Sequence, residues 1–234
     1  MASTAFHAVY PPLCMGCGVE TSAANGLCPS CWADTEFIYE PACTSCGAPL
    51  IGDTPGLCED CFADPPPWDD GSAVVVYGPV TARIIQALKH GDRLDFVPRL
   101  GKWMAQTGAP LISPKAVVVP VPVHWRRLLK RKFNQADLLA RQIARHHRLK
   151  YRNDVLLRTK GTQQQRSMSR EERVNNQENS FCVSDPSQIV GAHILLVDDV
   201  MTTGATLRAA AKTLRSAGVK TISISVFARV APNL

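Results

Sequence analysis

The sequence has 234 residues, 45% of them hydrophobic, and a formal net charge of +6. A chain of this length can bury one sizeable core together with a smaller appendage. It contains no uncharged apolar run of the roughly 18 residues that a membrane span needs, and its start lacks the cationic and apolar regions of a secretory signal. These features exclude membrane insertion, and we expect a cytoplasmic location.

The charge is divided sharply along the chain. Residues 1–70 contain ten acidic residues and no lysine or arginine. Residues 71–234 contain all 26 basic residues and the other ten acidic ones, which gives this part a net charge of +16. Such a change in composition indicates two different units joined in one chain.

Eight of the nine cysteines form four Cys-x-x-Cys pairs before residue 62. Two thiolates separated by two residues can face the same tetrahedral ion, and two such pairs complete one four-cysteine zinc site. The sequence therefore predicts two structural Zn2+ sites, built from Cys14, Cys17, Cys28, Cys31, Cys43, Cys46, Cys58 and Cys61. We favour pairing of the first knuckle with the second and of the third with the fourth, but the spacing leaves a cross-braced pairing of the first with the third open. A disulfide framework is the weaker alternative, because a reducing cytosol disfavours it.

The metal is expected to serve as the core of this segment. About sixty residues with scattered apolar side chains bury too little surface to fold alone, whereas a structural zinc site contributes roughly 10–16 kcal/mol of apparent folding free energy. Four thiolates leave no open coordination position, so catalytic zinc is not expected. We predict a zinc-binding domain over residues 1–64, a stiff polar linker over residues 65–71 and a larger domain over residues 72–234.

The larger domain alternates apolar strand patterns with amphipathic helix patterns. Strands are predicted at residues 73–77, 116–123, 193–197 and 219–228, and helices at residues 80–91, 134–147 and 206–218. This alternation predicts an α/β fold with a parallel sheet and helices on both faces, whose ligands bind at the carboxyl ends of the strands.

Residues 194–206 carry the clearest chemistry of this domain, because an apolar strand runs into two adjacent aspartates and then into a hydroxyl-rich loop. Gly204 lets the backbone approach a ligand, the threonines offer hydroxyl donors, and the next helix directs its first N–H groups at the loop. The loop suits a phosphate, whereas Asp198 and Asp199 suit a metal or the vicinal diol of a ribose. A ribose that carries a 5′-phosphate satisfies both.

The segment LLVDDVMTTGATL resembles the phosphoribosyl pyrophosphate (PRPP) motif of type I phosphoribosyltransferases. With the cysteine knuckles and the segments VPVPVHWRRLLKRKFNQADLLA and RTKGTQQQRSMSREERVNNQENSF, it makes nearly the whole chain similar to the ComF family. That family joins a double zinc ribbon to a type I phosphoribosyltransferase domain and is linked to competence for DNA uptake. The resemblance implies that Asp198 and Asp199 are the catalytic acids and bind the ribose hydroxyls. It also implies that PRPP binds with Mg2+, its 5′-phosphate at residues 202–206, within a site formed by Val200, Met201, Thr202, Thr203, Gly204, Ala205 and Thr206.

Two further segments would complete the site that the resemblance implies. One would hold the pyrophosphate, which needs cationic compensation as it leaves, and comprises Pro122, Val123, His124 and Arg126. The other is the polar stretch of residues 158–179, which contains Arg166 and matches a loop that closes over PRPP and excludes water.

Two positions depart from the family pattern. Thr202 stands where purine-salvage relatives carry an aspartate that contacts the incoming base, so a purine acceptor is disfavoured. Lys132 stands where a glycine is expected before Phe133, and it adds a positive charge.

Three functions are compatible with these residues. An enzyme would displace pyrophosphate from PRPP with the help of Mg2+ and transfer the phosphoribosyl group to an acceptor. The alternative is a protein that handles single-stranded DNA in natural transformation and uses the site to bind PRPP or a nucleotide. Residues 124–173 favour this alternative, with fifteen basic and four acidic residues. A structural interaction module is the weakest reading, and a homo-oligomer is compatible with each.

Overall fold

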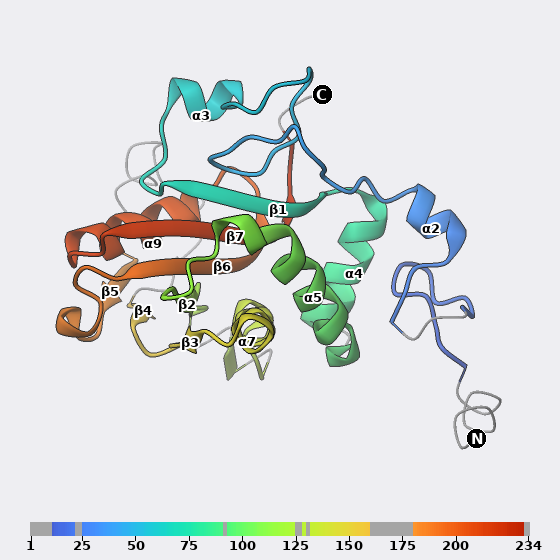
Figure 1. The fold of residues 1–234 in the computed structure, drawn as a ribbon. Helices are drawn as coiled ribbons and strands as arrows, with labels where there is room; N and C mark the ends of the chain where they lie inside the picture. The colour runs from blue at the N-terminus through green and yellow to red at the C-terminus, as the bar shows by residue number, and fades with distance from the viewer. Residues whose placement is uncertain are drawn as a thin grey trace, which may run out of the picture.

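The computed structural model describes residues 11–21, 25–90, 93–124, 128–129, 132–159 and 180–231. Its centre is a five-stranded sheet with the strand order β1-β7-β6-β2-β3, in which every neighbouring pair is parallel (Figure 1). The strands are β1 (Asp70–Val76), β2 (Val117–Pro120), β3 (Lys150–Tyr151), β6 (His193–Met201) and β7 (Thr221–Arg229). A separate antiparallel pair consists of β4 (Leu156–Arg158) and β5 (Phe181–Val183). The predicted α/β fold with a parallel sheet is confirmed.

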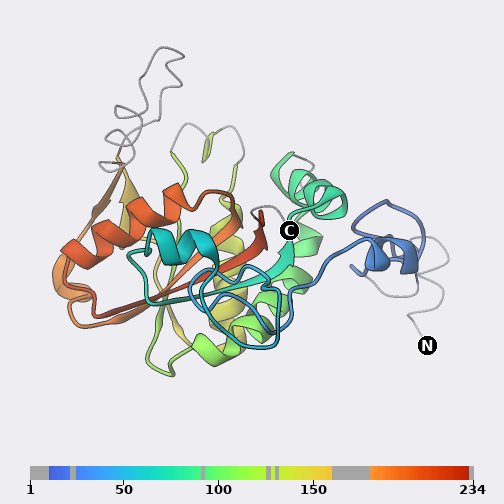
Figure 2. The same cartoon turned by 90° about the horizontal axis from the view of Figure 1, so that it is seen from above.

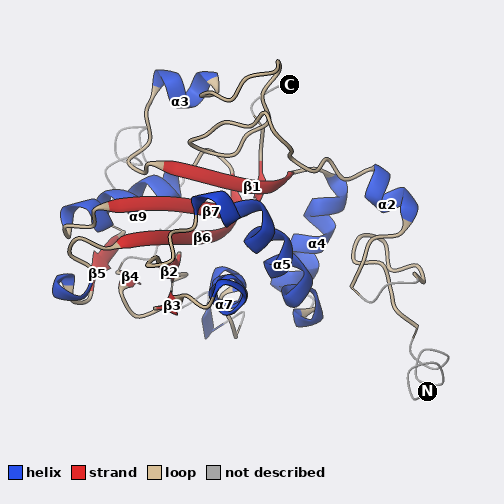
Figure 3. Cartoon of the chain, in the orientation of Figure 1, coloured by secondary structure: helices blue, strands red, loops and turns tan. Residues whose placement is uncertain are grey.

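Helices pack on both faces of the sheet, because successive residues of a buried strand point to opposite sides. One face meets α4 (Pro79–His90), α5 (Val97–Gly108) and α7 (Gln135–His147) through residues such as Leu195. The other meets α9 (Ala205–Ser216) through residues such as Leu196. Figure 3 shows the strands in red at the centre with the helices in blue around them. Short 3-10 turns occupy η1 (Leu94–Phe96), η2 (Ala109–Leu111) and η3 (Pro186–Gln188).

The cysteine half contains two five-residue helices, α2 (Pro29–Ala33) and α3 (Glu59–Ala63). Each begins directly after the first cysteine of a knuckle, so the helix presents the second cysteine of that knuckle one turn later. Figure 1 shows α2 beside α4 and α3 above β1, and Figure 2 shows the same elements from above. In the part of the chain that the structure describes, no helix is long and apolar enough to cross a membrane.

The two cysteine groups meet the larger domain at different places. Near the first group, the Arg83 guanidinium of α4 donates a hydrogen bond to the Gly16 carbonyl at 2.7 Å. Near the second group, the N–H of Gly71 in β1 donates to the Thr44 carbonyl at 3.0 Å. The first group therefore belongs to the α4 side of the sheet and the second to its β1 edge.

Several element boundaries differ from the predicted ones. β6 continues to Met201 instead of ending at Val197, because the residues around the acid pair keep their ladder with β7. β1 begins at Asp70, which lies inside the segment predicted as a linker. The sequence patterns do not predict α5, which places Leu100 and Met104 in the core.

Candidate functional site

The acid pair lies near the carboxyl end of β6, where the strand leads into α9. A loop of residues 202–204 joins the two elements. Val200 and Met201 therefore belong to the strand, and Ala205 and Thr206 belong to the helix, so the loop is shorter than the sequence suggests. The fold joins all of these residues in one strand–loop–helix unit at the carboxyl end of the strands, where parallel sheets bind ligands.

The two aspartates have different surroundings. Asp199 is buried, and one of its carboxylate oxygens lies 2.6 Å from Nζ of Lys89, in the last turn of α4. Asp198 is half-buried, and its carboxylate accepts a hydrogen bond from the N–H of Asp199 at 2.8 Å. Lys89 therefore supplies a positive charge within the site, next to the acid pair.

A raised pKa favours a proton on Asp198 in the absence of ligand. Burial, and then the neighbouring charge of Asp199, raise the pKa of Asp198 to about 8, although the N–H of Asp199 and the charge of Lys89 act in the opposite direction. A ligand that brings a cation, or hydroxyl donors, would replace this proton as the partner of the carboxylate. The geometry thus suits a diol or a metal-bound polyol better than a bare anion.

The loop after the strand has the backbone of an anion site. Gly204 has φ of 76° and precedes the first residue of α9, a helix of 12 residues. The left-handed φ favours glycine there, and a Cβ would also lie 2.7 Å from Cε of Met201, the mobile end of a flexible side chain. The side chains of Thr202 and Thr203 are exposed, and that of Thr206 is half-buried in the first helical turn. Hydroxyl groups therefore adjoin the first N–H groups of α9, and Oγ1 of Thr203 accepts a hydrogen bond from the Ala205 N–H at 3.4 Å.

A buried arginine holds this loop through hydrogen bonds to its backbone. Arg229, at the end of β7, is 4% exposed, and its guanidinium donates hydrogen bonds to the carbonyls of Met201, Thr202 and Val230. The N–H of Val230 donates to Met201 as well, at 2.9 Å. These bonds occupy the Thr202 carbonyl of the loop and the carbonyls of the two strand ends beside it, and they place a positive charge next to the loop, which favours an anion there.

The loop predicted to hold pyrophosphate follows β2, the next strand of the sheet. β2 and β6 are parallel with Pro120 opposite Val197, and the N–H of Val121 donates to the Val197 carbonyl at 2.8 Å. The half-buried Pro122, Val123 and His124 therefore leave the sheet at the same edge as the acid pair. Asn134, which caps α7, holds this loop from the other side by donating to the Val121 carbonyl at 3.0 Å.

Lys132 keeps the turn for which glycine was expected. Its φ is 66°, in the left-handed region that a lysine enters at a cost. Arg126 and Arg166, the other two predicted ligands of PRPP, lie outside the residues that the structure describes.

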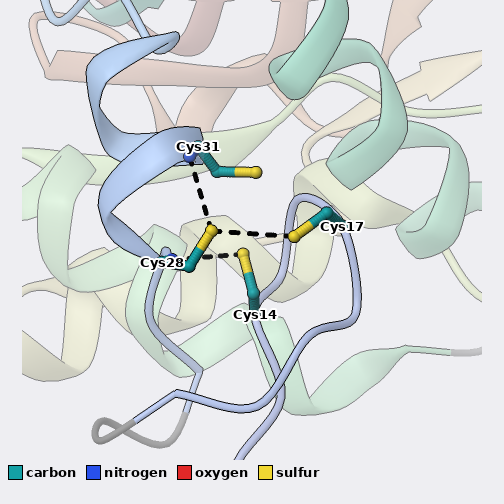
Figure 4. A group of neighbouring side chains, drawn as sticks. All are labelled: Cys14, Cys17, Cys28 and Cys31. Atoms are coloured by element: carbon teal, nitrogen blue, oxygen red, sulfur yellow. Dashed lines mark hydrogen bonds between the residues drawn. The ribbon is translucent and has the colours of Figure 1, made fainter.

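The cysteines form two separate groups, and the pairing is the sequential one that we favoured. Within each group the four sulfur atoms lie within 4.8 Å of one another, and the groups are Cys14, Cys17, Cys28 and Cys31, and then Cys43, Cys46, Cys58 and Cys61. Figure 4 shows the first group, in which the Cys17 and Cys28 sulfurs are 3.7 Å apart. The described residues carry no cross-braced arrangement, since the two groups share no cysteine.

Hydrogen bonds to the sulfurs of Cys14 and Cys43 fit thiolate ligands of Zn2+, whereas burial raises the pKa of Cys31 and Cys61. The N–H groups of Gly16 and Cys28 donate to Sγ of Cys14 at 3.3 and 3.2 Å. Burial acts to raise the pKa of Cys14, but these and other hydrogen bonds lower it to about 6. At the second group, a hydrogen bond from the Cys46 side chain is the main cause that lowers the pKa of Cys43 to about 4. Four thiolates around one point are the donor set of a structural zinc site.

Sequence reasoning missed Lys89 and Arg229. Nothing in the helical pattern of α4 distinguishes Lys89 from other surface lysines, because its partner Asp199 is far away in the chain. Arg229 had a signal that could have been used, since it follows the apolar run of β7 and lies opposite Met201 in the sheet. A charged residue that ends a buried strand needs partners nearby.

Comparison with protein families divides the chain in the same way. Residues 5–62 match the double zinc ribbon domain, and residues 135–232 match the phosphoribosyl transferase domain. The second match contains β6, the loop and α9.

Individual relatives are similar over most of the chain. The chain is 31% identical over 214 residues to competence protein F of Haemophilus influenzae, which covers 88% of this chain and 92% of that protein. It is 30% identical over 222 residues to the DNA utilization protein YhgH of Escherichia coli K12, with coverage of 92% and 95%. It is 28% identical over 212 residues to competence protein ComFC of Bacillus subtilis, with coverage of 86% and 82%.

Proposed function

The chain belongs to the ComF family, and we propose that it binds PRPP, or a related ribose 5-phosphate ligand, at the carboxyl end of β6. One observation carries this proposal. The acid pair of β6 is followed within a few residues by the Gly204 turn and the start of α9. The Arg229 guanidinium donates a hydrogen bond to the Thr202 carbonyl of this loop. A site for hydroxyl groups thus adjoins a site for an anion, in the order that a ribose with a 5′-phosphate requires.

The reaction that fits such a ligand is displacement of pyrophosphate. The bond between C1′ and the pyrophosphate oxygen breaks, the pyrophosphate leaves with the electron pair, and an acceptor nucleophile forms the new bond to C1′. Asp198 and Asp199 orient the ribose through its hydroxyl groups, and Lys89 compensates Asp199. Mg2+ bound together with PRPP would compensate the charge of the leaving group, and the carboxylate oxygens of the acid pair suit such a hard cation. Positioning and electrostatics would supply most of the rate.

Calorimetry with PRPP and Mg2+ tests the binding step. We expect heat from the wild-type protein and a loss of at least about tenfold in affinity in the double variant Asp198→Asn with Asp199→Asn, since two carboxylates are removed from the ligand. The matched control is Asp154→Asn, because Asp154 is an exposed aspartate of the same domain that pairs with Arg152. Equal affinity in all three proteins would contradict the proposed site.

Pyrophosphate release tests the transfer step. Wild-type protein with PRPP, Mg2+ and a panel of acceptors should release pyrophosphate in the presence of at least one acceptor, and the double variant should not. PRPP binding without release across a broad panel would favour a sensor over an enzyme.

A DNA-handling function is the second candidate, and the names of the relatives support it. Competence protein F and the DNA utilization protein are similar to this chain over most of its length. Residues 124–173 add a strongly basic segment that would suit the phosphates of a single strand. This candidate predicts binding to a single-stranded oligonucleotide that weakens steeply with salt, and the triple variant Arg126→Gln, Arg127→Gln and Arg131→Gln should flatten that slope.

We propose that the protein works in the cytoplasm. Eight cysteine ligands remain available to metal in a reducing compartment, whereas an oxidising one would favour disulfides.

A further inference from the structure

Trp68 connects the second cysteine group to the larger domain. It lies in the segment predicted as a polar linker, yet it is 4% exposed. Its indole N–H donates a hydrogen bond to the Ser45 carbonyl at 2.6 Å, and Ser45 lies between Cys43 and Cys46 in the third knuckle. A displacement of this knuckle would therefore shift the indole ring through that hydrogen bond.

The opposite end of the same ring faces the loop of the proposed ligand site. Cη2 of Trp68 lies 3.6 Å from the position that a Cβ at Gly204 would take, so the ring borders the backbone of the loop. Trp68, Met201 and Leu207 belong to one hydrophobic cluster together with the cysteines of the second group. The metal knuckle, the tryptophan and the residues that flank the loop thus belong to a single packed core.

The backbone next to Trp68 is held against α9. The Arg208 guanidinium lies over the Trp68 ring at 5.7 Å and donates to the carbonyls of Asp64 and Pro65 at 2.6 and 3.2 Å. About two helical turns later, Arg215 donates to the Pro67 carbonyl at 3.1 Å and to the Asp69 carboxylate at 2.5 Å. Two arginines of the helix that follows the loop therefore clamp the segment that carries the tryptophan.

We infer that Trp68 is a positioning residue for the loop of residues 202–204 and transmits to it the order imposed by metal at the second cysteine group. The loop needs a defined backbone to present its N–H groups, and Gly204 alone gives it conformational freedom rather than order. Ligand affinity at the loop therefore depends on an intact second cysteine group, and much less on the first, which packs against Val80 and Ile84 on the other side of the sheet. This inference deepens the proposed function and rests on it for its ligand.

Hydrogen exchange of the ligand-free, zinc-loaded protein gives the first test. In Trp68→Ala we expect the amides of residues 200–206 to exchange roughly tenfold faster than in the wild type, because the ring that packs on the loop is gone. Trp68→Phe keeps most of the ring but loses the bond to Ser45, and we expect an increase of about threefold. The matched control is Trp32→Ala in the first cysteine half, which should leave these amides within about twofold of the wild type.

Unchanged exchange of residues 200–206 in Trp68→Ala, or an equal change in Trp32→Ala, would overturn the inference. Trp68→Phe is the variant that decides if Trp68→Ala fails to fold, since the phenyl ring still fills the core. Both variants should retain two zinc ions per chain, one for each cysteine group, so that altered exchange reports the tryptophan and not metal loss.

Calorimetry with ribose 5-phosphate gives the second test. We expect a loss of at least about tenfold in affinity in Trp68→Ala and of about threefold in Trp68→Phe, with rescue by the aromatic ring marking a positioning role. If the wild type binds ribose 5-phosphate and Trp68→Ala binds it equally well, the coupling is wrong while the proposed function stands. If the wild type binds neither ribose 5-phosphate nor PRPP while the exchange differences appear, the proposed function is wrong and the coupling stands.

Discussion

The two cysteine groups share one local chemistry but have different neighbours. Cys17 of the first group is exposed, whereas all four cysteines of the second group are buried. Gly18 and Gly47 follow the equivalent cysteines of the two groups, with φ of 79° and 70°. A Cβ at Gly18 would meet open space, but a Cβ at Gly47 would lie 2.4 Å from the backbone nitrogen of Ala73 in β1. The same motif thus forms a peripheral module in one place and a part of the main core in the other.

Replacing one cysteine ligand in each group should show this difference most clearly. Cys46→Ser should lower the free energy of unfolding of the whole chain by about 5 kcal/mol or more, because the second site lies in the main core. Cys17→Ser should lower the stability of the sheet domain by under about 1 kcal/mol, because the first site can open locally. Urea unfolding followed by circular dichroism, together with zinc release to a chelating dye, measures both.

Cys182→Ser is the control for this pair, since Cys182 lies in β5, outside both groups. Its unfolding transition and its zinc content should match the wild type. Equal destabilisation by Cys46→Ser and Cys17→Ser would show that the two groups do not differ in the way their burial indicates.

Alanine at the two equivalent glycines sharpens the comparison without touching a metal ligand. Gly47→Ala should cost about 3 kcal/mol or more, because the new methyl group would overlap the β1 backbone in addition to the unfavourable φ. Gly18→Ala should cost only about 1 kcal/mol, because it carries the φ penalty alone. Thermal unfolding of the two zinc-loaded variants gives the difference, and a smaller effect at Gly47 than at Gly18 would contradict the docking of the second group on β1.

The pH dependence of stability tests the titration of the acid pair, which lies outside both cysteine groups. The pKa of Asp198 is raised in the folded protein, so between about pH 4 and 8 the folded state keeps a proton that the unfolded state releases. Stability should therefore fall as pH rises, by about 1 kcal/mol between pH 6 and 8 after allowance for solvent. Urea unfolding of zinc-loaded, ligand-free protein should show this slope, and Asp198→Asn should remove it. A slope that persists in Asp198→Asn would assign the titration to another group.

The smallest effect on stability is expected at Lys132, which lies outside both cysteine groups. It serves as a reference for the larger effects at the glycines and cysteines. Lys132→Gly should stabilise the protein by about 0.5 kcal/mol, since relief of the left-handed strain exceeds the entropy that glycine adds to the unfolded chain. Lys132→Ala removes the same charge and keeps the strain, so it should not stabilise. The difference in melting temperature between Lys132→Gly and Lys132→Ala measures the effect of the backbone strain alone. Equal melting temperatures would show that the strain is negligible.

Much of the fold could be predicted because its signals are local. The spacing of Cys14 and Cys17, and of the other knuckles, depends on neighbouring residues, and so does the apolar run of β6 that ends in the acid pair. The predicted strand ended too early because two aspartates read as a break in an apolar pattern. In the sheet, however, Asp198 keeps its place opposite Val226 in β7, and the ladder continues past it.

The rest of the site depends on contacts between distant segments, which no local pattern encodes. Lys89 reaches Asp199 from another helix, and Arg229 reaches the loop from another strand. Trp68 stands in a stretch of prolines and aspartates that is typical of a linker, and its burial follows from the knuckle and the helix that enclose it. Residues of this kind are found when each buried charge or ring is traced to its partner.

The order of the strands also bears on how the chain is made. β1 pairs with β7, the last strand that the structure describes, and Asp69 binds the N–H of Ile222 from 153 positions away. During synthesis β1 precedes β7 and remains an apolar strand without its sheet partner until β7 is made. A nascent chain that stalls before residue 221 would therefore carry zinc-bound cysteine knuckles but an incomplete sheet. We expect chaperones to bind such an intermediate.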